Sequence, residues 1–571
     1  MSRQEMDRLG WGELDVLLVT GDGYVDHPAF GAALLGRWLV SHGYRVGIVA
    51  QPRWDSPEDI ARLGRPRLFA GVTAGALDSM LAHYTAFRKK RSDDAYTPGG
   101  KAGARPNRAT IVYTNLVRQA FPGLPVVIGG VEASMRRVSH YDFWTDKIRR
   151  SMLLDSKADL LVYGMAERAV LEIAQRLGER VACRVPRAAC PNEEPRASMH
   201  ALHGIRGTVS AGEQPDSSAW QLPSHEEIES DPKKLMEATL ALESQAHNAT
   251  AWATQATQGR TLAFAPPAEP LSTAELDAVY ALPFARQPHP SYREPIPAVE
   301  MIQFSVTTHR GCAGGCSFCS LALHQGRRIR SRSRESLLAE VTGFTKHADW
   351  KGSLSDVGGP SANMWGAECA GDPATCRRVS CLHPSICRHF EPHQAAIAEL
   401  LEAIARLPGV KHVRTASGVR HDLALRDEGY LRALVGEFTG GQLKLAPEHV
   451  CDRVLTLMRK PPFAAFEQFL TVFERESRRA KKEQYIVPYL ISAFPGCTDS
   501  DMRDMGNWFK QRNWRPQQVQ CFIPTPGTVA MAMYCAGIDP NGRLIPVART
   551  DAERLRQHGI LSGTFGPVRA R

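Results

Sequence analysis

Three cysteines in a short glycine-containing segment most constrain what this chain can fold into. Cys312, Cys316 and Cys319 lie in the segment His309-Arg-Gly-Cys-Ala-Gly-Gly-Cys-Ser-Phe-Cys319, which provides no obvious fourth ligand. A structural zinc site takes four protein ligands, and an iron–sulfur cube that only transfers electrons normally takes four cysteines. Three thiolates on one tight loop therefore favour a cube with one open iron. A zinc site with a distant fourth ligand and thiols without any ligand are the alternatives.

The triplet resembles the signature of the radical S-adenosylmethionine (SAM) superfamily. The resemblance implies that Cys312, Cys316 and Cys319 hold a [4Fe-4S] cluster whose open iron chelates the amino and carboxylate groups of SAM. An electron from a donor such as flavodoxin or ferredoxin then cleaves SAM to a 5′-deoxyadenosyl radical, while the protein orients the cofactor and excludes water. Phe318 matches the aromatic residue that lies near the adenine in this superfamily. Ordinary core packing is an equally good interpretation of Phe318.

Short apolar segments alternate with helical patterns on both sides of the triplet. A strand is predicted at 302–306, just before the cysteine loop, and Ser333 is placed to cap a helix that includes Leu337 and Phe344. A second helix is predicted from Ile397 to Ile404 by its 3.6-residue spacing. Further strands are predicted at 353–357, 412–416, 442–446, 485–491 and 519–523. These βα units fit a partial (β/α)6 barrel over residues 296–540, with its chemistry at the carboxyl ends of the strands.

Two glycines follow the second predicted barrel strand. Gly358 and Gly359 precede Pro360 and are expected at the same end of the barrel as the cysteine loop. In the radical SAM superfamily a turn at this position, often Gly-Gly-Glu, offers backbone carbonyls to the amino group of SAM. The resemblance implies this role for Gly358 and Gly359, and proline in place of glutamate removes only a carboxylate. A plain turn is the alternative interpretation.

Residues 1–185 predict an N-terminal doubly wound parallel sheet of the α/β class. Apolar segments at 15–20 and 46–49 enclose a helical pattern, and strands are also predicted at 109–113, 126–128 and 160–163. In several radical SAM families such a sheet holds cobalamin through a histidine. The nearest match here, Asp26-His27, has the wrong spacing. The segment 97–108, which contains Arg105, is interpreted as a surface loop or as a mobile loop that contacts anions.

Two other parts of the chain lack this alternation. Residues 186–295 predict an irregular connector with one embedded helix at 235–253, because prolines and polar residues interrupt the pattern. Residues 541–571 are predicted to be a short C-terminal tail rich in Arg and Gly.

Charge and hydropathy limit the classes of protein. The net charge of +10 and the pI of about 9.0 favour an anionic partner, and nucleic acid is one possibility, although no recognised binding motif accompanies the charge. No segment approaches the ~18 apolar residues of a membrane span, and residues 1–14 are polar. We therefore expect a cytoplasmic protein without a membrane partner, in which the 13 cysteines stay reduced.

A second group of cysteines lies within the predicted barrel, in a segment that also contains His383 and His389. The group consists of Cys369, Cys376, Cys381 and Cys387. Zinc, a second cluster, ordinary reduced thiols and a redox disulfide all remain open, since none of the spacings is Cys-x2-Cys.

Several other polar side chains lie near predicted strand ends without a secure role. They are Arg414, Ser417, Arg420, Glu448 and His449, together with Cys451 and Cys497. In the superfamily such positions often contact the ribose or carboxylate of SAM, and either cysteine is a candidate radical relay. Satisfied hydrogen bonds and apolar packing are the alternative interpretation, so the catalytic acid or base is unknown.

A larger set of motifs resembles the YgiQ family of radical SAM proteins. The motifs are LPSHEE at 222–227, LPFARQPHPSY at 282–292, HQGR at 324–327, SDVGGPSAN at 355–363, APEH at 446–449 and FIPTPGT at 522–528. The resemblance runs from about Asp15 to Asp539, after which the chain departs from the family. It implies a SAM-dependent enzyme with a [4Fe-4S] cluster whose substrate is unassigned.

The sequence therefore predicts a radical SAM enzyme that acts on an unidentified substrate. One alternative is a radical SAM transferase that moves methyl or methylthio groups to RNA or protein, although no second RNA-binding domain is recognisable. The other alternative is a non-catalytic, metal-bearing protein that binds nucleic acid, which the basic pI suggests.

Overall fold

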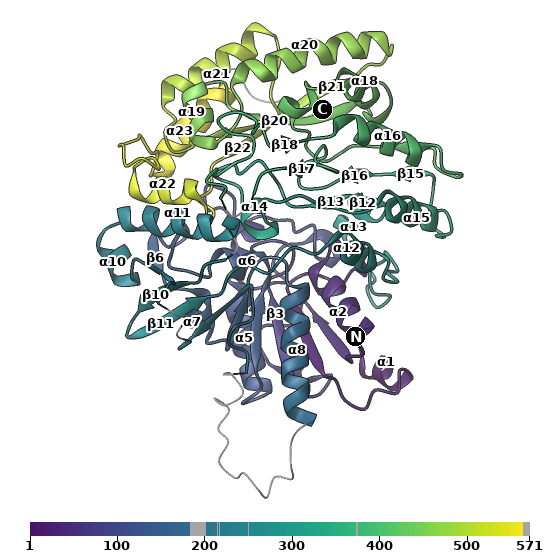
Figure 1. Cartoon of the computed structure of the whole chain (residues 1–571), viewed down its shortest axis with the longest axis vertical. Coiled ribbons are helices and arrows are strands. Elements are labelled where there is room, and N and C mark those ends of the chain that lie inside the picture. Colours follow the sequence, from purple (N-terminus) through teal and green to yellow (C-terminus); the bar gives the residue numbers. More distant parts are fainter. Residues whose placement is uncertain (183–200, 214, 216, 249, 373–374, 564–571) are drawn as a thin grey trace, which may run out of the picture. The chain divides into compact units, whose positions relative to one another are not determined.

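The chain folds into two compact units (Figure 1). The computed structural model describes residues 1–182, 201–213, 215, 217–248, 250–372 and 375–563. The first unit comprises Met1–Pro270 and Leu282–Gln303, and the second comprises Leu271–Ala281 and Phe304–Arg571.

A nine-stranded sheet forms the centre of the first unit. Its strand order is β2-β1-β3-β4-β7-β8-β11-β10-β9, and the first five of these strands run parallel. These five are β1 (Val16–Thr20), β2 (Val46–Ala50), β3 (Phe69–Thr73), β4 (Val126–Gly129) and β7 (Leu160–Val162). Helices connect each strand to the next along the chain, so the predicted doubly wound parallel sheet is confirmed.

Helices cover both faces of these parallel strands. Leu17 and Val19 of β1 pack in one apolar cluster with α5, whereas Val16 and Leu18 pack in another with α2 and α8. Successive strand residues point to opposite faces, so a strand between two helical layers is apolar throughout. The helices of this part are α1 (Arg3–Arg8), α2 (Gly31–Ser41), α3 (Glu58–Ala61), α4 (Ser79–His83), η1 (Pro98–Gly100), α5 (Ala109–Ala120), α6 (Gly130–Met135), α7 (Met152–Ser156) and α8 (Glu167–Ala182); β5 (His140–Asp142) and β6 (Lys147–Arg149) form a hairpin.

Residues 208–264 extend this sheet, whereas the sequence predicted an irregular connector. They form β8 (Thr208–Ala211), β9 (Trp220–Leu222), α10 (His225–Ser230), α11 (Lys233–Asn248), β10 (Ala253–Thr257) and β11 (Arg260–Phe264). The β10–β11 hairpin turns at Gln258 and Gly259, whose φ angles of 48° and 72° suit a tight hairpin turn. These short strands contain Thr and Gln rather than apolar runs, so their pairing depends on the sheet beside them.

Residues 109–113 form the first part of helix α5, whereas the sequence predicted a strand there. The buried residues Ala109, Tyr113 and Leu116 recur at helical spacing. The strand between β1 and β4 is β3, which the sequence interpretation missed. A short β-branched run is compatible with a helix or a strand, and the pattern beyond Tyr113 distinguishes them.

Six strand positions within the described residues organise the second unit. In chain order they are β12 (Ser305–Thr307), β15 (Ser353–Leu354) continued by β16 (Asp356–Gly358), β19 (His412–Val413), β20 (Gln442–Glu448), β21 (Tyr485–Ser492) and β22 (Gln518–Cys521). β12 pairs with β16, β15 with β19, and β20 with β21 and then β22, all in parallel. A parallel bridge between Val419 and Leu445 links the segment after β19 to β20. The predicted partial (β/α)6 barrel is confirmed.

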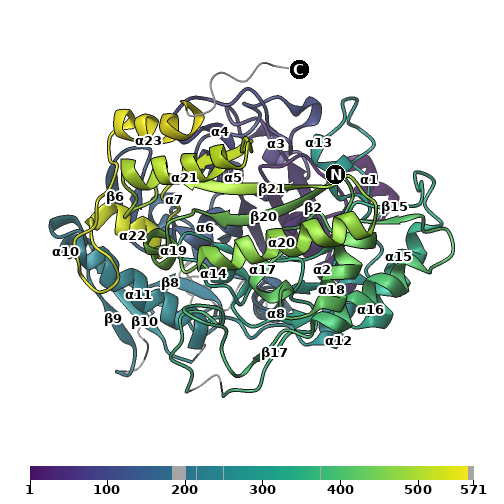
Figure 2. The ribbon, with the colours of Figure 1, turned by 90° about the horizontal axis from the view of Figure 1, so that it is seen from above.

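Helices separate the barrel strands along the chain, and β20 and β21 run side by side in Figure 2. Ser333 caps α15 as predicted, because its hydroxyl accepts the Ser336 N–H. The helices are α12 (Thr273–Tyr280), α14 (Leu321–Gln325), α15 (Arg334–Phe344), α16 (Gln394–Ala405), α17 (His421–Ala424), α18 (Glu428–Ala433), η2 (Leu434–Phe438), α19 (Asp452–Met458), α20 (Phe463–Arg479), α21 (Asp499–Gln511), α22 (Val529–Ala536) and α23 (Asp551–Gly563); α13 (Pro297–Ile302) belongs to the first unit.

Helix α23 lies in the segment predicted to be a tail. It packs against α21 and the strands β21 and β22. Arg554 of α23 is fully buried and donates to the carbonyl oxygen of Phe522, while Gln557 donates to the carbonyl oxygen of Cys497 at 3.2 Å. This part of the chain therefore contributes to the core of the second unit.

Candidate functional site

The three-cysteine loop follows β12 and is closed by a short antiparallel ladder. β13 (His309–Arg310) pairs with β14 (Arg330–Ser331), and the Cys312 N–H donates to the Gly326 carbonyl oxygen at 3.1 Å. Gly311 has a φ of +87°, and a Cβ there would lie 2.2 Å from the carbonyl oxygen of Arg328. A Cβ at Gly315 would lie 2.6 Å from the carbonyl oxygen of Val379. The glycines beside the cysteines are therefore required by close backbone packing.

All three cysteines of the loop are free thiols with intermediate exposure. Burial, together with the neighbouring thiols of Cys316 and Cys312, raises the pKa of Cys319 to about 12. Burial also raises the pKa of Cys312. Buried soft sulfur donors on one loop fit an iron–sulfur cluster, which deprotonates its thiols on binding.

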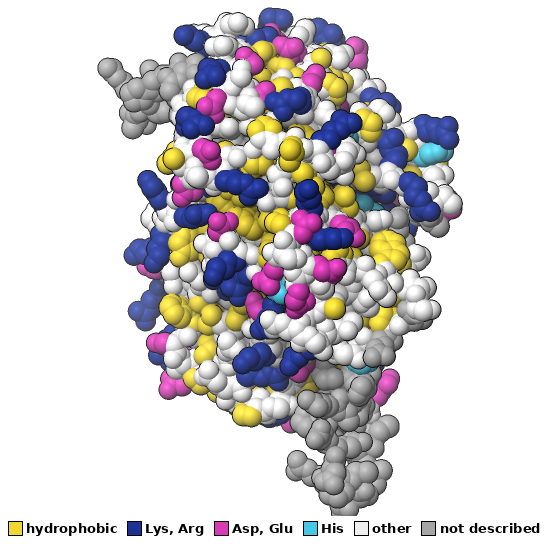
Figure 3. Space-filling model, turned by 90° about the vertical axis from the view of Figure 1, so that its left-hand side faces the viewer, with side chains coloured by type: hydrophobic (Ala, Val, Ile, Leu, Met, Phe, Trp, Pro, Cys, Tyr) yellow, Lys and Arg dark blue, Asp and Glu magenta, His cyan; other side chains and the backbone are white. Residues whose placement is uncertain are grey.

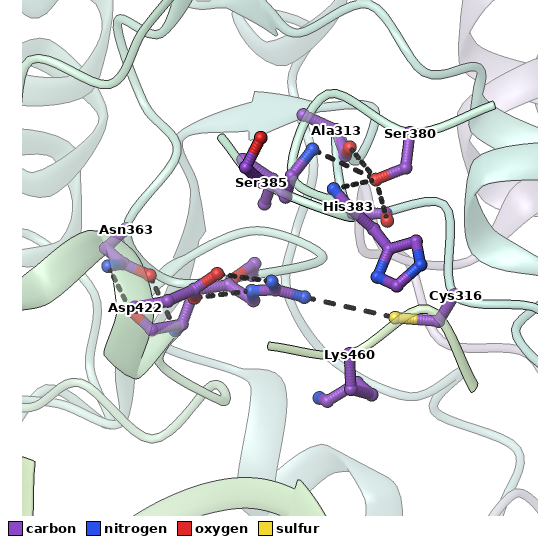
Figure 4. Close-up of polar contacts among 12 residues, drawn as sticks. Ala313, Cys316, Asn363, Ser380, His383, Ser385, Asp422 and Lys460 are labelled. Carbon is purple, nitrogen blue, oxygen red and sulfur yellow. Dashed lines mark hydrogen bonds and ion pairs between the residues drawn. The ribbon is translucent and has the colours of Figure 1, made fainter. Parts of the chain in front are cut away.

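Arg420 directs a positive charge at this loop. Its Nη1 lies 4.0 Å from Cys316 Sγ, and its other two guanidinium nitrogens donate to the Asp422 carboxylate at 2.9 and 2.6 Å (Figure 4). The backbone of Arg420 is also fixed, since its N–H donates to Asn363 Oδ1 at 2.8 Å and its carbonyl accepts from Asn363 Nδ2 at 3.0 Å. Burial alone would lower the pKa of Arg420, but Asp422 and the thiols raise it. The guanidinium therefore stays charged beside the cysteines.

The two glycines predicted to contact SAM lie at the carboxyl end of β16. Gly358 is paired with Thr307 of β12, and its carbonyl oxygen accepts the Thr308 N–H at 2.7 Å. A Cβ at Gly359 would lie 2.6 Å from Cε1 of His309. The imidazole of His309 is fully buried, its Nδ1 is 2.9 Å from Thr308 Oγ1, and its Nε2 has no hydrogen-bond partner among the described residues. An unpartnered buried nitrogen beside this turn fits a site that receives a ligand.

Asp356 orders the neighbouring strand end, and the sequence interpretation missed it. Its carboxylate accepts the N–H groups of Ala416 and Ser417 at 2.8 and 2.9 Å, and it also accepts the Ser417 hydroxyl. Arg414 contributes its carbonyl oxygen, which accepts the Val357 N–H at 3.0 Å. Ser417 thus helps to fix the barrel mouth. In the sequence, its position after a predicted strand was the indication of such a role.

The end of β20 carries a buried ion pair. Glu448 Oε1 lies 3.6 Å from Lys460 Nζ, and the side chains are 10% and 6% exposed. Burial raises the pKa of Glu448, although Lys460 opposes the effect. Glu448 has a φ of 69°, which non-glycine residues rarely adopt. Lys460 was not identified from the sequence because only the fold brings it to this strand end.

His449, Cys451 and Cys497 pack together. The Cys451 N–H donates to His449 Nδ1 at 3.0 Å, and His449 Nε2 lies 3.5 Å from Cys497 Sγ. Both ring nitrogens of His449 are therefore engaged within the barrel.

Phe318 of the cysteine loop packs edge-on against Phe494, with ring centroids 6.1 Å apart.

The second cysteine segment lies against the first. The Cys381 N–H donates to the Ala313 carbonyl oxygen at 3.0 Å, and the Ser380 hydroxyl donates to the Gly314 carbonyl oxygen at 2.6 Å (Figure 4). Cys369, Cys376, Cys381 and Cys387 are free thiols. Among the described residues, no group of three or more His, Cys, Asp or Glu side chains is arranged to hold a metal ion. The thiolates of a cube bind different irons, so they lie further apart than the ligands of one ion.

Comparisons with known proteins connect this geometry with a family. A family model described as "Radical SAM N-terminal" matches residues 1–305. A UPF0313 protein of Geobacter sulfurreducens is 50% identical, with 98% of this chain and 91% of its own length covered. A UPF0313 protein of Thermotoga neapolitana is 47% identical, with 96% and 95% covered. The chain belongs to the UPF0313 family, which is also called the YgiQ family.

Solved structures share the fold of this UPF0313 member. The radical SAM methyltransferase TsrM of Kitasatospora setae, with tryptophan and a SAM analogue bound, superposes with a TM-score of 0.54 at 14% identity, covering 97% of this chain and 89% of that one. TsrM with cobalamin and a [4Fe-4S] cluster bound gives a TM-score of 0.52 at 14% identity, covering 92% and 78%. At this identity the likeness concerns the fold alone.

The histidine nearest to a cobalamin motif is engaged within the first unit. His27 is 2% exposed, its Nδ1 accepts the Ala29 N–H at 3.0 Å, and its Nε2 lies 2.8 Å from Nη1 of Arg286. Burial, together with the charge of Arg286, lowers the pKa of His27 to about 3. The residues present therefore do not fit a cobalamin site in which His27 is the lower ligand.

The segment 97–108 differs from the interpretation of an anion-contacting loop. Arg105 is 1% exposed and donates to the Asp94 carboxylate at 2.9 and 3.1 Å, and it lies 3.0 Å from Asp22 Oδ1. Arg108 pairs with Asp142 at 2.5 Å. These carboxylates neutralise the two arginines, which the sequence could not show because the partners are distant along the chain.

Charged side chains of both signs are interspersed on the face drawn in Figure 3. Lys and Arg side chains are spread over this face among Asp, Glu and apolar side chains. In the part of the chain that the structure describes, the helices are too short or too polar to cross a membrane.

Proposed function

We propose that the protein is a radical SAM enzyme in which Cys312, Cys316 and Cys319 hold a [4Fe-4S] cluster. The observation that carries the proposal is the position of three thiols on one loop after β12, at the same strand ends as the Gly358–Gly359 turn. When bound, the cluster would supply an open iron that chelates SAM and the electron that cleaves it to methionine and a 5′-deoxyadenosyl radical. The substrate that the radical attacks is unidentified.

The side chains around the loop have complementary tasks in this proposal. Arg420 offsets the negative charge that the thiolates acquire when they bind metal, and Asp422 keeps its guanidinium in place. The Gly358 carbonyl oxygen already accepts from Thr308, so the turn would offer the Gly359 carbonyl to the amino group of SAM. Phe318 would provide an apolar surface for the adenine. Neutral His309 offers an unpartnered nitrogen beside the turn.

The proposed electron donor is a low-potential protein such as flavodoxin or ferredoxin. The three thiols of the loop must stay reduced for metal binding, which agrees with a cytoplasmic setting.

Formation of 5′-deoxyadenosine tests the proposal. Protein purified and reconstituted without oxygen is expected to produce it from SAM and dithionite, and Cys316→Ala is expected to reduce the product to the background of a reaction without enzyme. Cys535→Ala changes a cysteine of α22, outside both loops, and is expected to retain activity. Iron-loaded wild-type protein that leaves SAM intact would contradict the proposal.

Radical SAM methyl transfer is a second candidate. It is favoured by the fold shared with TsrM, a radical SAM methyltransferase, over 97% of this chain. If the protein transfers methyl groups, label from methyl-tritiated SAM should enter RNA or protein of an extract when cobalamin is supplied. Production of 5′-deoxyadenosine without transfer of label would favour the first candidate.

A further inference from the structure

The segment 369–387 contains four thiols that the proposed function leaves unused. β17 (Glu368–Cys369) pairs antiparallel with β18 (Phe390–Glu391), and the Ala370 N–H donates to the His389 carbonyl oxygen at 2.9 Å. These contacts join the two ends of the segment. Within it, the Cys387 N–H donates to the Cys381 carbonyl oxygen at 2.7 Å. Cys369 is paired with Phe390, whose N–H donates to the Cys387 carbonyl oxygen at 3.0 Å, so the backbones of Cys369, Cys381 and Cys387 lie close together.

One cation lies beside the thiols of this segment. Nη2 of Arg327 lies 3.6 Å from Cys376 Sγ. All four cysteines are free. A cation beside Cys376 stabilises the thiolate form that a metal ligand requires.

The segment also forms one packed body with the three-cysteine loop. Cys312, Cys381 and Cys387 pack around the same apolar cluster, which contains Met364 and Phe390. The hydrogen bonds from Ser380 and Cys381 to the backbone of the first loop lie at the same contact. Cys381 and Cys387 are therefore held against a folded core, while Cys369 is exposed on the paired strand β17.

We propose that Cys369, Cys376, Cys381 and Cys387 bind a second iron–sulfur cluster, with every iron held by a cysteine. Four thiolates complete the coordination of such a cube, whereas three leave one iron open. A zinc ion would draw its four ligands to about 2.3 Å from one point. Zinc bound to the same four thiolates would also be a closed site, and metal analysis distinguishes the two. The closed cluster leaves no coordination site for SAM.

A variant without the first site tests this assignment. The change Cys312→Ala, Cys316→Ala and Cys319→Ala removes the triplet and leaves the second segment intact. After anaerobic reconstitution with ferrous iron and sulfide, this variant should retain about four irons and four sulfides per chain. Its reduced form should give an electron paramagnetic resonance signal that does not change when SAM is added. Zinc in place of iron, or a variant without metal, would overturn the assignment.

The reciprocal variant provides the matched control. Cys381→Ala with Cys387→Ala should lose about four of the wild-type irons, whereas Cys451→Ala with Cys535→Ala should lose none. If the triplet variant does not fold, as judged by circular dichroism, iron analysis of the wild type decides: about eight irons per chain support the second cluster and about four overturn it. The signal that responds to SAM tests the proposed function separately, because the second cluster is expected to be unresponsive.

Discussion

The carboxyl edge of the first unit's sheet and the mouth of the barrel are both built from βα units, yet they use charged side chains differently. At the sheet edge, Arg105 is enclosed by the carboxylates of Asp94 and Asp22. At the barrel mouth, Arg420 is held by one carboxylate, that of Asp422, and its remaining nitrogen faces Cys316. The sheet edge neutralises its charges within the fold, whereas the barrel mouth keeps a cation next to potential metal ligands.

The comparison shows that a position at a strand end does not by itself identify a functional residue. Doubly wound sheets and barrels both place loops at this edge. What differs is whether nearby side chains of opposite charge already satisfy the polar groups there. Variants in the two regions should accordingly affect stability in one and redox or ligand-binding properties in the other.

Arg105→Met should produce the largest change, and it should be a loss of stability. The substitution leaves Asp22 and Asp94 buried without their cation, which typically costs about 3–5 kcal/mol. Urea unfolding followed by circular dichroism measures the effect, and the iron content of the folded protein should stay the same. Arg53→Met, which removes an exposed ion pair with Glu58, is the control and should leave the curve unchanged. Equal curves for the two variants would contradict the assigned role of Arg105.

Gly359→Ala should weaken SAM binding. The new Cβ would lie 2.6 Å from the His309 ring, and overpacking of this kind costs about 1–3 kcal/mol. If about 2 kcal/mol of this overpacking cost arises only when SAM is bound, the affinity for SAM falls roughly 30-fold. Titration of the cluster signal with SAM measures the dissociation constant. Gly418→Ala has no heavy atom within 4 Å of its new Cβ and should bind SAM normally; equal affinity in the two variants would argue against the turn as part of the site.

Arg420→Met should lower the reduction potential of the cluster proposed at Cys312, Cys316 and Cys319. Loss of a positive charge near Cys316 disfavours the added electron, and a charge-assisted contact worth about 1.4 kcal/mol corresponds to about 59 mV for a one-electron couple. Redox titration followed by electron paramagnetic resonance measures the shift. Arg420→Lys keeps the charge and should shift the potential less. A potential equal to that of the wild type would mean that Arg420 acts only through packing.

His449→Gln should reduce the pH dependence of stability. Burial lowers the pKa of His449 to about 4, with Asp501 opposing and Arg453 adding to the effect, whereas the unfolded value is about 6.5. The folded state then holds fewer protons than the unfolded chain, so stability falls as the pH falls below 6.5. This residue should account for about 1 kcal/mol between pH 6.5 and 5.5. Urea unfolding at pH 6.5 and at pH 5.5 measures the free energy of unfolding. The control His412→Gln, which changes an exposed histidine, should show this loss of stability, and His449→Gln should not.

Much of the barrel could be predicted from local sequence because its signals are local. The Ser333 cap, the helix through Ile397 and the glycines after β16 follow from neighbouring residues. The ends of β12 and β19 differ from the predicted bounds by a few residues, since strand ends depend on the pairing partner.

The strands β8–β11, the ion pair of Arg105 with Asp22, and the contacts that fix the backbone of Arg420 beside Cys316 could not be predicted in the same way. Each depends on partners that are distant along the chain, such as Asp22 for Arg105 and Asn363 for Arg420. Single-sequence periodicity contains no information on such pairings. The cysteine spacing indicated the type of centre, but not the cation beside it.

The hydrogen bonds that join the two cysteine segments bear on how the protein matures. Ser380 donates to Gly314, 66 positions earlier in the chain. During synthesis the first loop emerges from the ribosome well before the residues that complete its backbone contacts. We therefore expect iron to be inserted late, after translation has passed Ser380. Until then the thiols of the three-cysteine loop can be oxidised, and we expect this oxidation to be the main hazard of assembly in air.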